Sequence, residues 1–214
     1  MTGQDQLSEF GSGLVEVGTG PVTAAQVVAV ARSRPRVRLA AAAVDAITAS
    51  RSHVDALAGS GTPVYGVSTG FGALATRHIE PELRAQLQRS LVRSHAASTG
   101  SEIEAEVVRA MMLLRLSTLA SGRTGIRPET ATTYARLIDA GITPIVREHG
   151  SLGCSGDLAP LAHAALAVMW EGDVRDAEGV RCDAAVAMAA ATSVVPRLDL
   201  IPRASCSLPN PLLG

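Results

Sequence analysis

Residues 101–122 read SEIEAEVVRAMMLLRLSTLASG, and this stretch carries the clearest structural signature of the chain. Ser101 and Glu104 have the spacing of a capping box, in which a hydroxyl and a carboxylate satisfy the first amides of a helix. Apolar residues then recur at every turn until Ser121 and Gly122, a typical helix stop. We therefore expect one long, mostly buried helix here.

Five further helices are expected from capping residues, prolines at first helical positions and apolar spacing. Strand-like alternation is absent from any long stretch, so the sequence predicts a mainly α-helical fold. The expected helices are a short one opened by a Thr23 and Gln26 capping box and stopped by Pro35, one at about 37–57, one from Pro81, one from Pro128 to Gly141, and a last one from Pro160 to about Trp170.

Composition excludes several classes of protein. With 47% hydrophobic and 18% charged residues the chain is not expected to be disordered, and no apolar run approaches the about 20 residues of a membrane span. A net charge of -1 and 2% aromatic residues argue against nucleic-acid binding. The polar, acidic N-terminus does not resemble a signal peptide, so we expect a cytoplasmic protein. Cys154, Cys182 and Cys206 lack metal-ligand spacing, so we expect free thiols and no metal.

Two glycine-rich loops stand between the expected helices. The first loop, residues 65–72, reads YGVSTGFG, and its spacing is not that of a phosphate-binding loop. Tyr65 could accept a proton there if its pKa were lowered. The alternative is a packed tyrosine with a hydrogen-bonded hydroxyl, which composition alone favours.

The second loop, residues 150–163, reads GSLGCSGDLAPLAH. One interpretation is a turn that feeds a helix, with Ser155 or Asp157 capping the first amides. The other is a backbone that closes on itself. The Gly156 nitrogen would bond to the Cys154 carbonyl carbon, and Ser155 would lose its hydroxyl. Loss of two waters would leave a five-membered ring with an exocyclic methylidene.

Both loops, together with QRSLVRSH at residues 88–95, resemble the aromatic amino-acid ammonia-lyase family, and most closely the N-terminal part of the histidine ammonia-lyases. The resemblance covers residues 14–173 and continues weakly to 191. It implies the N-terminal portion of a helical fold of the fumarase/aspartase-like superfamily, with glycine-rich catalytic loops, in a homotetramer. It also implies that L-histidine is converted to urocanate and ammonia, a step of histidine catabolism.

The same resemblance assigns the site residues. Cys154, Ser155 and Gly156 would form the cofactor methylidene-imidazolone (MIO, 4-methylidene-imidazole-5-one) autocatalytically, with Asp157 supporting ring closure. Cys154 stands where alanine is more common, and Ser155 is the strict requirement. Tyr65 would be catalytic. His95 would bind substrate and, with Ser94, favours the histidine-specific branch. Without the resemblance, His95 would be a helix histidine satisfied by a nearby partner, and His163 is expected simply to cap or pack.

The chain is expected to divide into a mobile lead at 1–13, a truncated lyase-like helical region at 14–191, and a disordered tail unlike the family at 192–214. Such a truncated or frameshifted chain lacks the family's carboxylate-binding arginine and would have little activity alone. Two alternatives stay open. One is a tyrosine or phenylalanine ammonia-lyase or an aminomutase of the same family. The other is a non-catalytic helical fragment that acts only in self-association or hetero-association.

Overall fold

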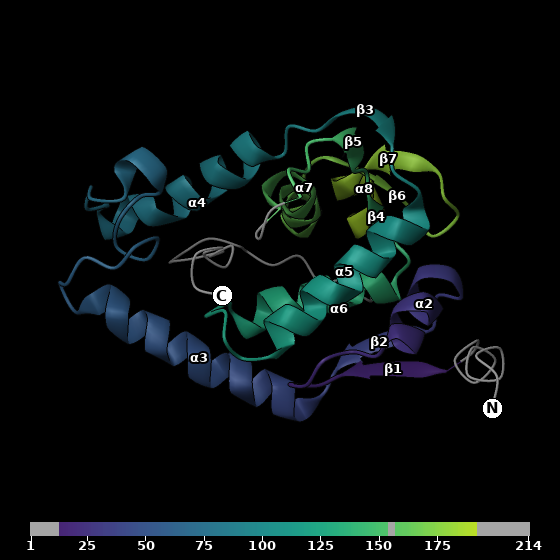
Figure 1. Cartoon of the computed structure of the whole chain (residues 1–214), viewed down its shortest axis with the longest axis horizontal. Coiled ribbons are helices and arrows are strands. Elements are labelled where there is room, and N and C mark those ends of the chain that lie inside the picture. The colour runs from purple at the N-terminus through teal and green to yellow at the C-terminus, as the bar shows by residue number, and fades with distance from the viewer. Residues whose placement is uncertain (1–12, 154–156, 192–214) are drawn as a thin grey trace.

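The computed structural model describes residues 13–153 and 157–191 (Figure 1). These residues form seven α-helices, so the fold is mainly α-helical, as the sequence predicts. The helices are α2 (Ala24–Arg32), α3 (Ala41–Gly59), α4 (Pro81–His95), α5 (Ala105–Ala120), α6 (Pro128–Asp139), α7 (Leu158–Val168) and α8 (Ala184–Ala190).

Short strands link the helices in three small sheets. The parallel pair joins β1 (Leu14–Val17) to β2 (Arg36–Leu39), with Val15 opposite Val37. The antiparallel pair joins β3 (Thr99–Glu102) to β5 (Arg147–His149). The third sheet has the order β4 (Thr143–Pro144), β6 (Asp173–Arg175), β7 (Arg181–Asp183), all antiparallel.

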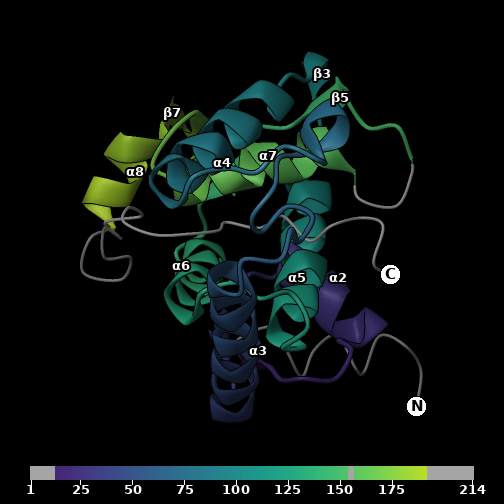
Figure 2. The ribbon, with the colours of Figure 1, turned by 90° about the vertical axis from the view of Figure 1, so that its left-hand side faces the viewer.

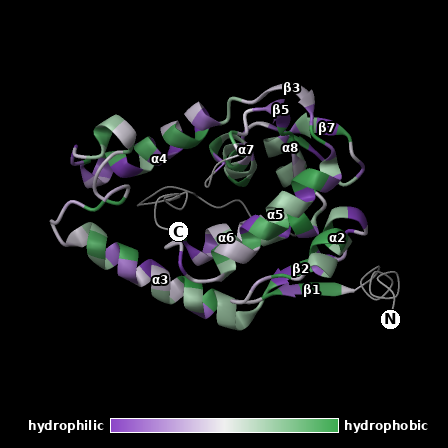
Figure 3. Ribbon diagram, in the orientation of Figure 1, coloured by the Kyte–Doolittle hydropathy of each residue, from purple (hydrophilic) through white to green (hydrophobic). Residues whose placement is uncertain are grey.

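The core is built around α5, as its sequence predicts. Figure 2 shows α5 between α2 and α6, and it also packs against α3, β1 and β4. Because neighbours cover it on several sides, α5 buries four large side chains almost completely, those of Met112, Leu113, Leu116 and Leu119. In Figure 3 hydrophobic residues dominate α7, whereas α3 and α4 alternate between hydrophobic and hydrophilic positions. None of the helices within residues 13–153 and 157–191 has both the length and the apolar character of a membrane span.

A buried arginine ties α5 to α2. Arg109 donates a hydrogen bond from Nε to the carbonyl oxygen of Ala31 at 2.8 Å, and its Nη2 donates to the same oxygen. Ala31 lies in the last turn of α2, where the helix dipole favours a cation. Burial lowers the pKa of Arg109, because the charged guanidinium has lost part of its hydration.

The hydrogen bonds at the helix N-termini test the two predicted capping boxes. The Thr23 capping box is confirmed, since Gln26 N donates to Thr23 Oγ1 at 3.2 Å and Thr23 N donates to Gln26 Oε1 at 2.8 Å. The Ser101 and Glu104 box is wrong. Ser101 lies in β3, and Glu104 precedes α5 without a side-chain cap. Ser101 belongs to the strand that pairs with β5, and Glu104 is itself the N-cap residue of α5.

Two further expectations need correction, and one helix was missed. The helix expected at 37–57 begins only at Ala41, because residues 36–39 pair with β1 and the amide of Val37 donates to Asp139 Oδ1 at 2.9 Å. Helix α7 begins at Leu158 rather than at Pro160. Helix α8 was not expected. The expected lead at 1–13 and tail at 192–214 fall almost wholly outside the described residues, which include only residue 13 of them.

The burial of α5 predicts unequal effects of two leucine truncations on one helix. Leu116 is fully buried, whereas Leu114 is 51% exposed. Leu116→Ala should lower the free energy of unfolding by about 2–5 kcal/mol, because it removes buried methyl groups and leaves a cavity. Leu114→Ala should change that free energy by no more than about 0.5 kcal/mol. Urea denaturation measures both, and equal losses would contradict the placement of α5.

Candidate functional site

A carboxylate joins the two flanks of positions 154–156 in the second loop. Asp157 accepts a hydrogen bond from the Leu152 amide through Oδ1 at 3.2 Å, and its Oδ2 accepts one from the Ser151 hydroxyl. The Ser151 oxygen in turn accepts the Gly153 amide at 3.3 Å. Asp157 therefore closes the chain around three residues.

Those three residues, Cys154, Ser155 and Gly156, lie outside the described residues. Asp157 occupies the position before α7, but its side chain makes no capping hydrogen bond to the helix. The interpretation of Asp157 as a helix cap is therefore wrong, because its carboxylate points back to Ser151 and Leu152.

The residues on either side of positions 154–156 are placed as the formation of a ring from the intervening backbone would require. Ring closure would require the amide nitrogen of residue 156 to approach the carbonyl carbon of residue 154, so the chain must be held folded on itself. The hydrogen bonds from Ser151 and Leu152 to Asp157 supply such a restraint at both ends. Gly153 contributes a φ of 62°, a left-handed conformation that favours glycine. The residues present therefore fit MIO.

His95 is the last residue of α4 and is half-buried. Its Nδ1 lies 2.7 Å from the Leu91 carbonyl oxygen, which can only accept a hydrogen bond, so Nδ1 is the donor. In the tautomer with its proton on Nδ1, Nε2 is a hydrogen-bond acceptor. Without the family resemblance, His95 was expected to be a helix histidine bound to a nearby partner, and Leu91 is such a partner. The same hydrogen bond also orients the ring.

His163 on α7 packs against Ser98, as expected. Its Nε2 lies 2.7 Å from the Ser98 hydroxyl and accepts the Ser98 amide at 3.4 Å. The hydroxyl oxygen of Ser98 also accepts the amide of Arg147 at 3.2 Å. The pKa of His163 is lowered, first by burial and then by the positive charge of Arg147. Ser98 and His163 therefore join the segment after His95 to β5 and α7.

Two other contacts hold the same elements together. Gly150 passes so close to its neighbours that an added Cβ would lie 2.8 Å from Ser98 Cβ and 3.1 Å from Ala159 Cβ. Arg93 on α4 donates from Nε and Nη2 to the two carboxylate oxygens of Glu171, each at 2.7 Å, just beyond α7. Sequence reasoning missed Ser98, Arg93 and Glu171, because only their approach in space distinguishes them.

Tyr65 is held within the first loop. Its hydroxyl oxygen accepts the Gly72 amide at 3.3 Å, and its ring meets Phe71 edge to face, with centroids 5.7 Å apart. Buried Ser68 accepts the Val64 amide through Oγ at 2.9 Å, one residue before Tyr65. These contacts match the packed, hydrogen-bonded tyrosine that composition favours, although Tyr65 is still 37% exposed.

The structure brings together some of the expected site residues but not all of them. His95 and the second loop are joined through Ser98 and His163. The first loop precedes α4, whereas His95 ends it, and a helix of 15 residues is about 22 Å long. Within residues 13–153 and 157–191, no hydrogen bond joins Tyr65 to His95 or to Asp157.

The described ranges also show where possible metal ligands and one thiol lie. Among residues 13–153 and 157–191, no cluster of three His, Cys, Asp or Glu side chains could hold a metal ion. Cys182 is a free thiol in β7, and its pKa is raised by burial and by the neighbouring carboxylates of Asp176 and Asp183.

Comparison with known proteins gives one consistent family. The aromatic amino acid lyase family model matches residues 22–203. Histidine ammonia-lyase of Streptomyces coelicolor is 64% identical over 165 residues, which are 77% of this chain and 32% of the relative. A probable histidine ammonia-lyase of Halobacterium salinarum is 45% identical over 170 residues. The chain thus spans about a third of the length of the curated relatives that it matches.

Solved structures of that family share the fold. Histidine ammonia-lyase from Trypanosoma cruzi matches 83% of this chain with a TM-score of 0.74 and 30% identity, over 34% of its own length. A tyrosine aminomutase from Streptomyces globisporus matches 82% of this chain with a TM-score of 0.75 and 34% identity, over 33% of its own length.

The lowered pKa of His163 predicts a pH dependence of stability. Below the unfolded value of 6.5, the unfolded chain takes up a proton that the folded chain resists. The free energy of unfolding should therefore fall as the pH falls from 6.5 toward the lowered pKa, and this contribution should be fully present above 6.5.

Denaturation between about pH 5 and pH 8 measures this contribution. His163→Gln should remove it, whereas His53→Gln, at an exposed position on α3, should retain it. A His163→Gln variant with the same pH dependence as the wild type would contradict the placement of His163.

Proposed function

The chain belongs to the aromatic amino acid lyase family, and we propose that it carries the cofactor-forming and histidine-recognising part of a histidine ammonia-lyase. The observation that carries the proposal is the closure of the second loop by Asp157 around Cys154, Ser155 and Gly156. The 64% identity with the histidine ammonia-lyase of Streptomyces coelicolor supports histidine as the substrate.

Formation of MIO requires two dehydrations. The Gly156 nitrogen bonds to the Cys154 carbonyl carbon, and the carbonyl oxygen leaves as water with the amide hydrogens of Gly156 and Ser155. The Ser155 hydroxyl then leaves as a second water with the α-hydrogen of the same residue. Atoms balance without an oxidant. Asp157 favours the first step, because it holds the loop folded before the bond forms.

The side chains of this chain then act on the substrate. When present, MIO supplies an electrophile that makes the amino group of the substrate a better leaving group. His95 accepts a hydrogen bond from the substrate imidazole through Nε2, since its Nδ1 proton is held by Leu91. The Tyr65 oxygen, to which the Gly72 amide donates a hydrogen bond, would take up the β-proton of the substrate, and this proton would leave with the ammonia. The products are urocanate and ammonia.

The family relationship supports three further parts of the proposal. L-histidine is the small-molecule partner, the working assembly is a homotetramer, and the protein acts in the cytoplasm in histidine catabolism, with no nucleic-acid or membrane partner. The division at residues 13 and 191 also stays a prediction. The family match runs on to residue 203, into the part that we expect to be an unrelated tail.

An aminomutase that uses the same ring is the second candidate. The tyrosine aminomutase of Streptomyces globisporus resembles this chain in fold as closely as the histidine enzyme of Trypanosoma cruzi does. Products distinguish the two activities, because an aminomutase returns a β-amino acid whereas a lyase releases ammonia. The imidazole of His95 favours the lyase with histidine as substrate.

The mass of the purified chain tests formation of MIO. We expect the wild type to weigh two waters less than its sequence. Cys154→Ala, which introduces the residue more common in the family, should lose the same two waters. Ser155→Ala should not form the methylidene, because it has no hydroxyl to lose. A wild-type chain at its unmodified mass would show that this chain does not make the cofactor.

Activity of the 214-residue chain is expected to be negligible even when MIO forms. A zwitterionic substrate needs a cation for its carboxylate, and a misplacement of even about 1 Å costs on the order of a hundredfold in rate. No arginine here matches the family's carboxylate-binding position. Urocanate absorbance measures turnover, with Ser155→Ala as the control. Robust turnover by the wild type that vanishes in the control would overturn this expectation.

A further inference from the structure

A long connection carries the first loop between α3 and α4. Helix α3 ends at Gly59 and α4 begins at Pro81, so residues 60–80 hold only the short 3-10 turn η1 (Gly72–Leu74) and an isolated β-bridge between Thr69 and His78. Connections longer than about 12–15 residues are uncommon unless they are functional. The position of Tyr65 therefore depends on whatever fixes the two ends of this connection.

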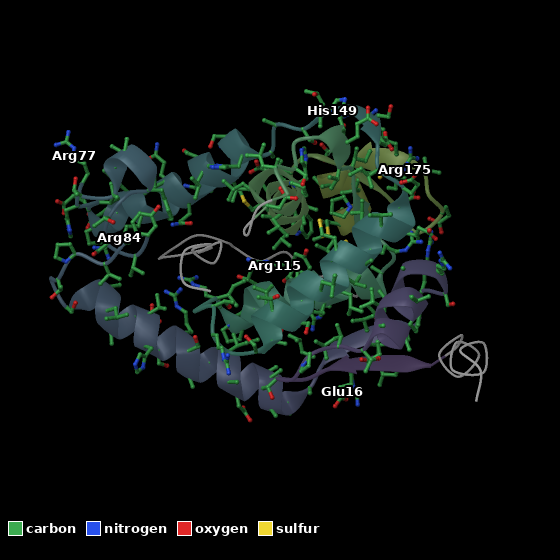
Figure 4. The ribbon with its side chains drawn as sticks, in the orientation of Figure 1. Glu16, Arg77, Arg84, Arg115, His149 and Arg175 are labelled. Carbon is green, nitrogen blue, oxygen red and sulfur yellow. The ribbon has the colours of Figure 1, made fainter. Side chains whose placement is uncertain are left out.

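Arg84 binds both ends. It lies in the first turns of α4 and is 9% exposed. Its Nη1 donates to the carbonyl oxygen of Ala58 at 3.2 Å, just before the connection begins. Its Nε donates to the carbonyl oxygen of Ile79 at 3.0 Å, just before the connection ends. Figure 4 shows Arg84 between the adjacent ends of α3 and α4.

Hydrogen bonds continue from Ile79 to the residue before Tyr65. The Ile79 amide donates to the Ser68 carbonyl oxygen at 2.9 Å, so both faces of this residue's backbone are bound. Ser68 in turn accepts the Val64 amide through Oγ at 2.9 Å. Arg84 is thus connected to Val64, the residue before Tyr65, through a short, partly buried series of contacts.

A guanidinium suits this place for two reasons. Ala58 lies in the last turn of α3, where the helix dipole favours a positive charge. The planar fork of arginine can also bind two carbonyl oxygens at once, which the single ammonium of lysine does less well. The exposed Arg77 of the same connection points away from the molecule in Figure 4 and offers a natural comparison.

We propose that Arg84 is a positioning residue for Tyr65, because its guanidinium holds together the two ends of the connection that carries the first loop. The catalytic importance of this placement rests on the proposed function. The placement itself is a property of this chain and is testable without activity. A residue that only stabilised the start of α4 would leave the surroundings of Tyr65 unchanged.

The test uses fluorotyrosine incorporated into the full chain and observed by fluorine NMR. The chain has two tyrosines, and the second, Tyr134, is buried in the core and serves as an internal reference. Arg84→Met should shift or broaden the Tyr65 resonance and leave that of Tyr134 in place. Arg77→Met should move neither. An unchanged Tyr65 resonance in Arg84→Met would overturn the proposal.

Amide hydrogen exchange provides the second measurement. In Arg84→Met, the amides of Val64 and Ile79 should exchange at least about tenfold faster, since a hydrogen bond to a charged group is lost, while α5 and α6 should keep their protection. Equal acceleration in the core would show general destabilisation instead. Arg84→Lys then distinguishes general destabilisation from loss of positioning, because lysine keeps the positive charge but cannot bind both carbonyl oxygens as the planar guanidinium does. It should reproduce the Tyr65 shift with the core intact, and a wild-type spectrum would contradict the proposal.

These results separate the proposal from the function on which it builds. If the wild type lost no water, the cofactor would be absent, yet the resonance of Tyr65 would still report on Arg84. If the wild type lost two waters and Arg84→Met left Tyr65 in place, the positioning role would fail and the family activity would stand.

Discussion

The burial of α5 on several sides is the constraint on which the rest of the structure depends. Its side chains Met112, Leu113, Leu116 and Leu119 can leave water only if α2, α3 and α6 surround them. The apolar α7 completes the interior, and Ser98 with His163 fastens the end of α4 to it. The site residues therefore lie on loops, or in the case of His95 at a helix end, that are attached to this core. This arrangement gives rigid support to segments that have little regular structure of their own.

Local signals predicted much of the helical framework. Thr23 with Gln26, Pro81 and Pro128 act within one turn of their own helices, so the sequence contains the information needed to place them. The errors arise where distant segments compete for the same backbone. Residues 36–39 pair with β1, and residues 99–102 pair with β5, which lies almost fifty positions later. Strands of two to four residues are too short for a periodic pattern, so only the assembled fold defines them.

The candidate site likewise has one part that the sequence could predict and one part that it could not. The two loops and His95 were recognisable because their residue types occur in a specific order. The contacts that hold them are long-range and leave no local pattern. In the sequence, nothing distinguishes Arg84 from other arginines on helix surfaces. In the structure, it donates to carbonyl oxygens 26 and 5 positions away. Asp157 was expected near the ring-forming residues, but the choice of Ser151 and Leu152 as its partners depends on how the loop folds back.

Closure of the second loop by Asp157 is tested most directly by the hydrogen exchange of a single amide. Leu152 is 85% exposed, so its amide would exchange rapidly if the loop were open. Because that amide donates to Asp157, it should be protected in the wild type and lose its protection in Asp157→Ala. Residue-resolved exchange by NMR measures both. An unprotected Leu152 amide in the wild type, or protection that survives Asp157→Ala, would contradict the closed loop.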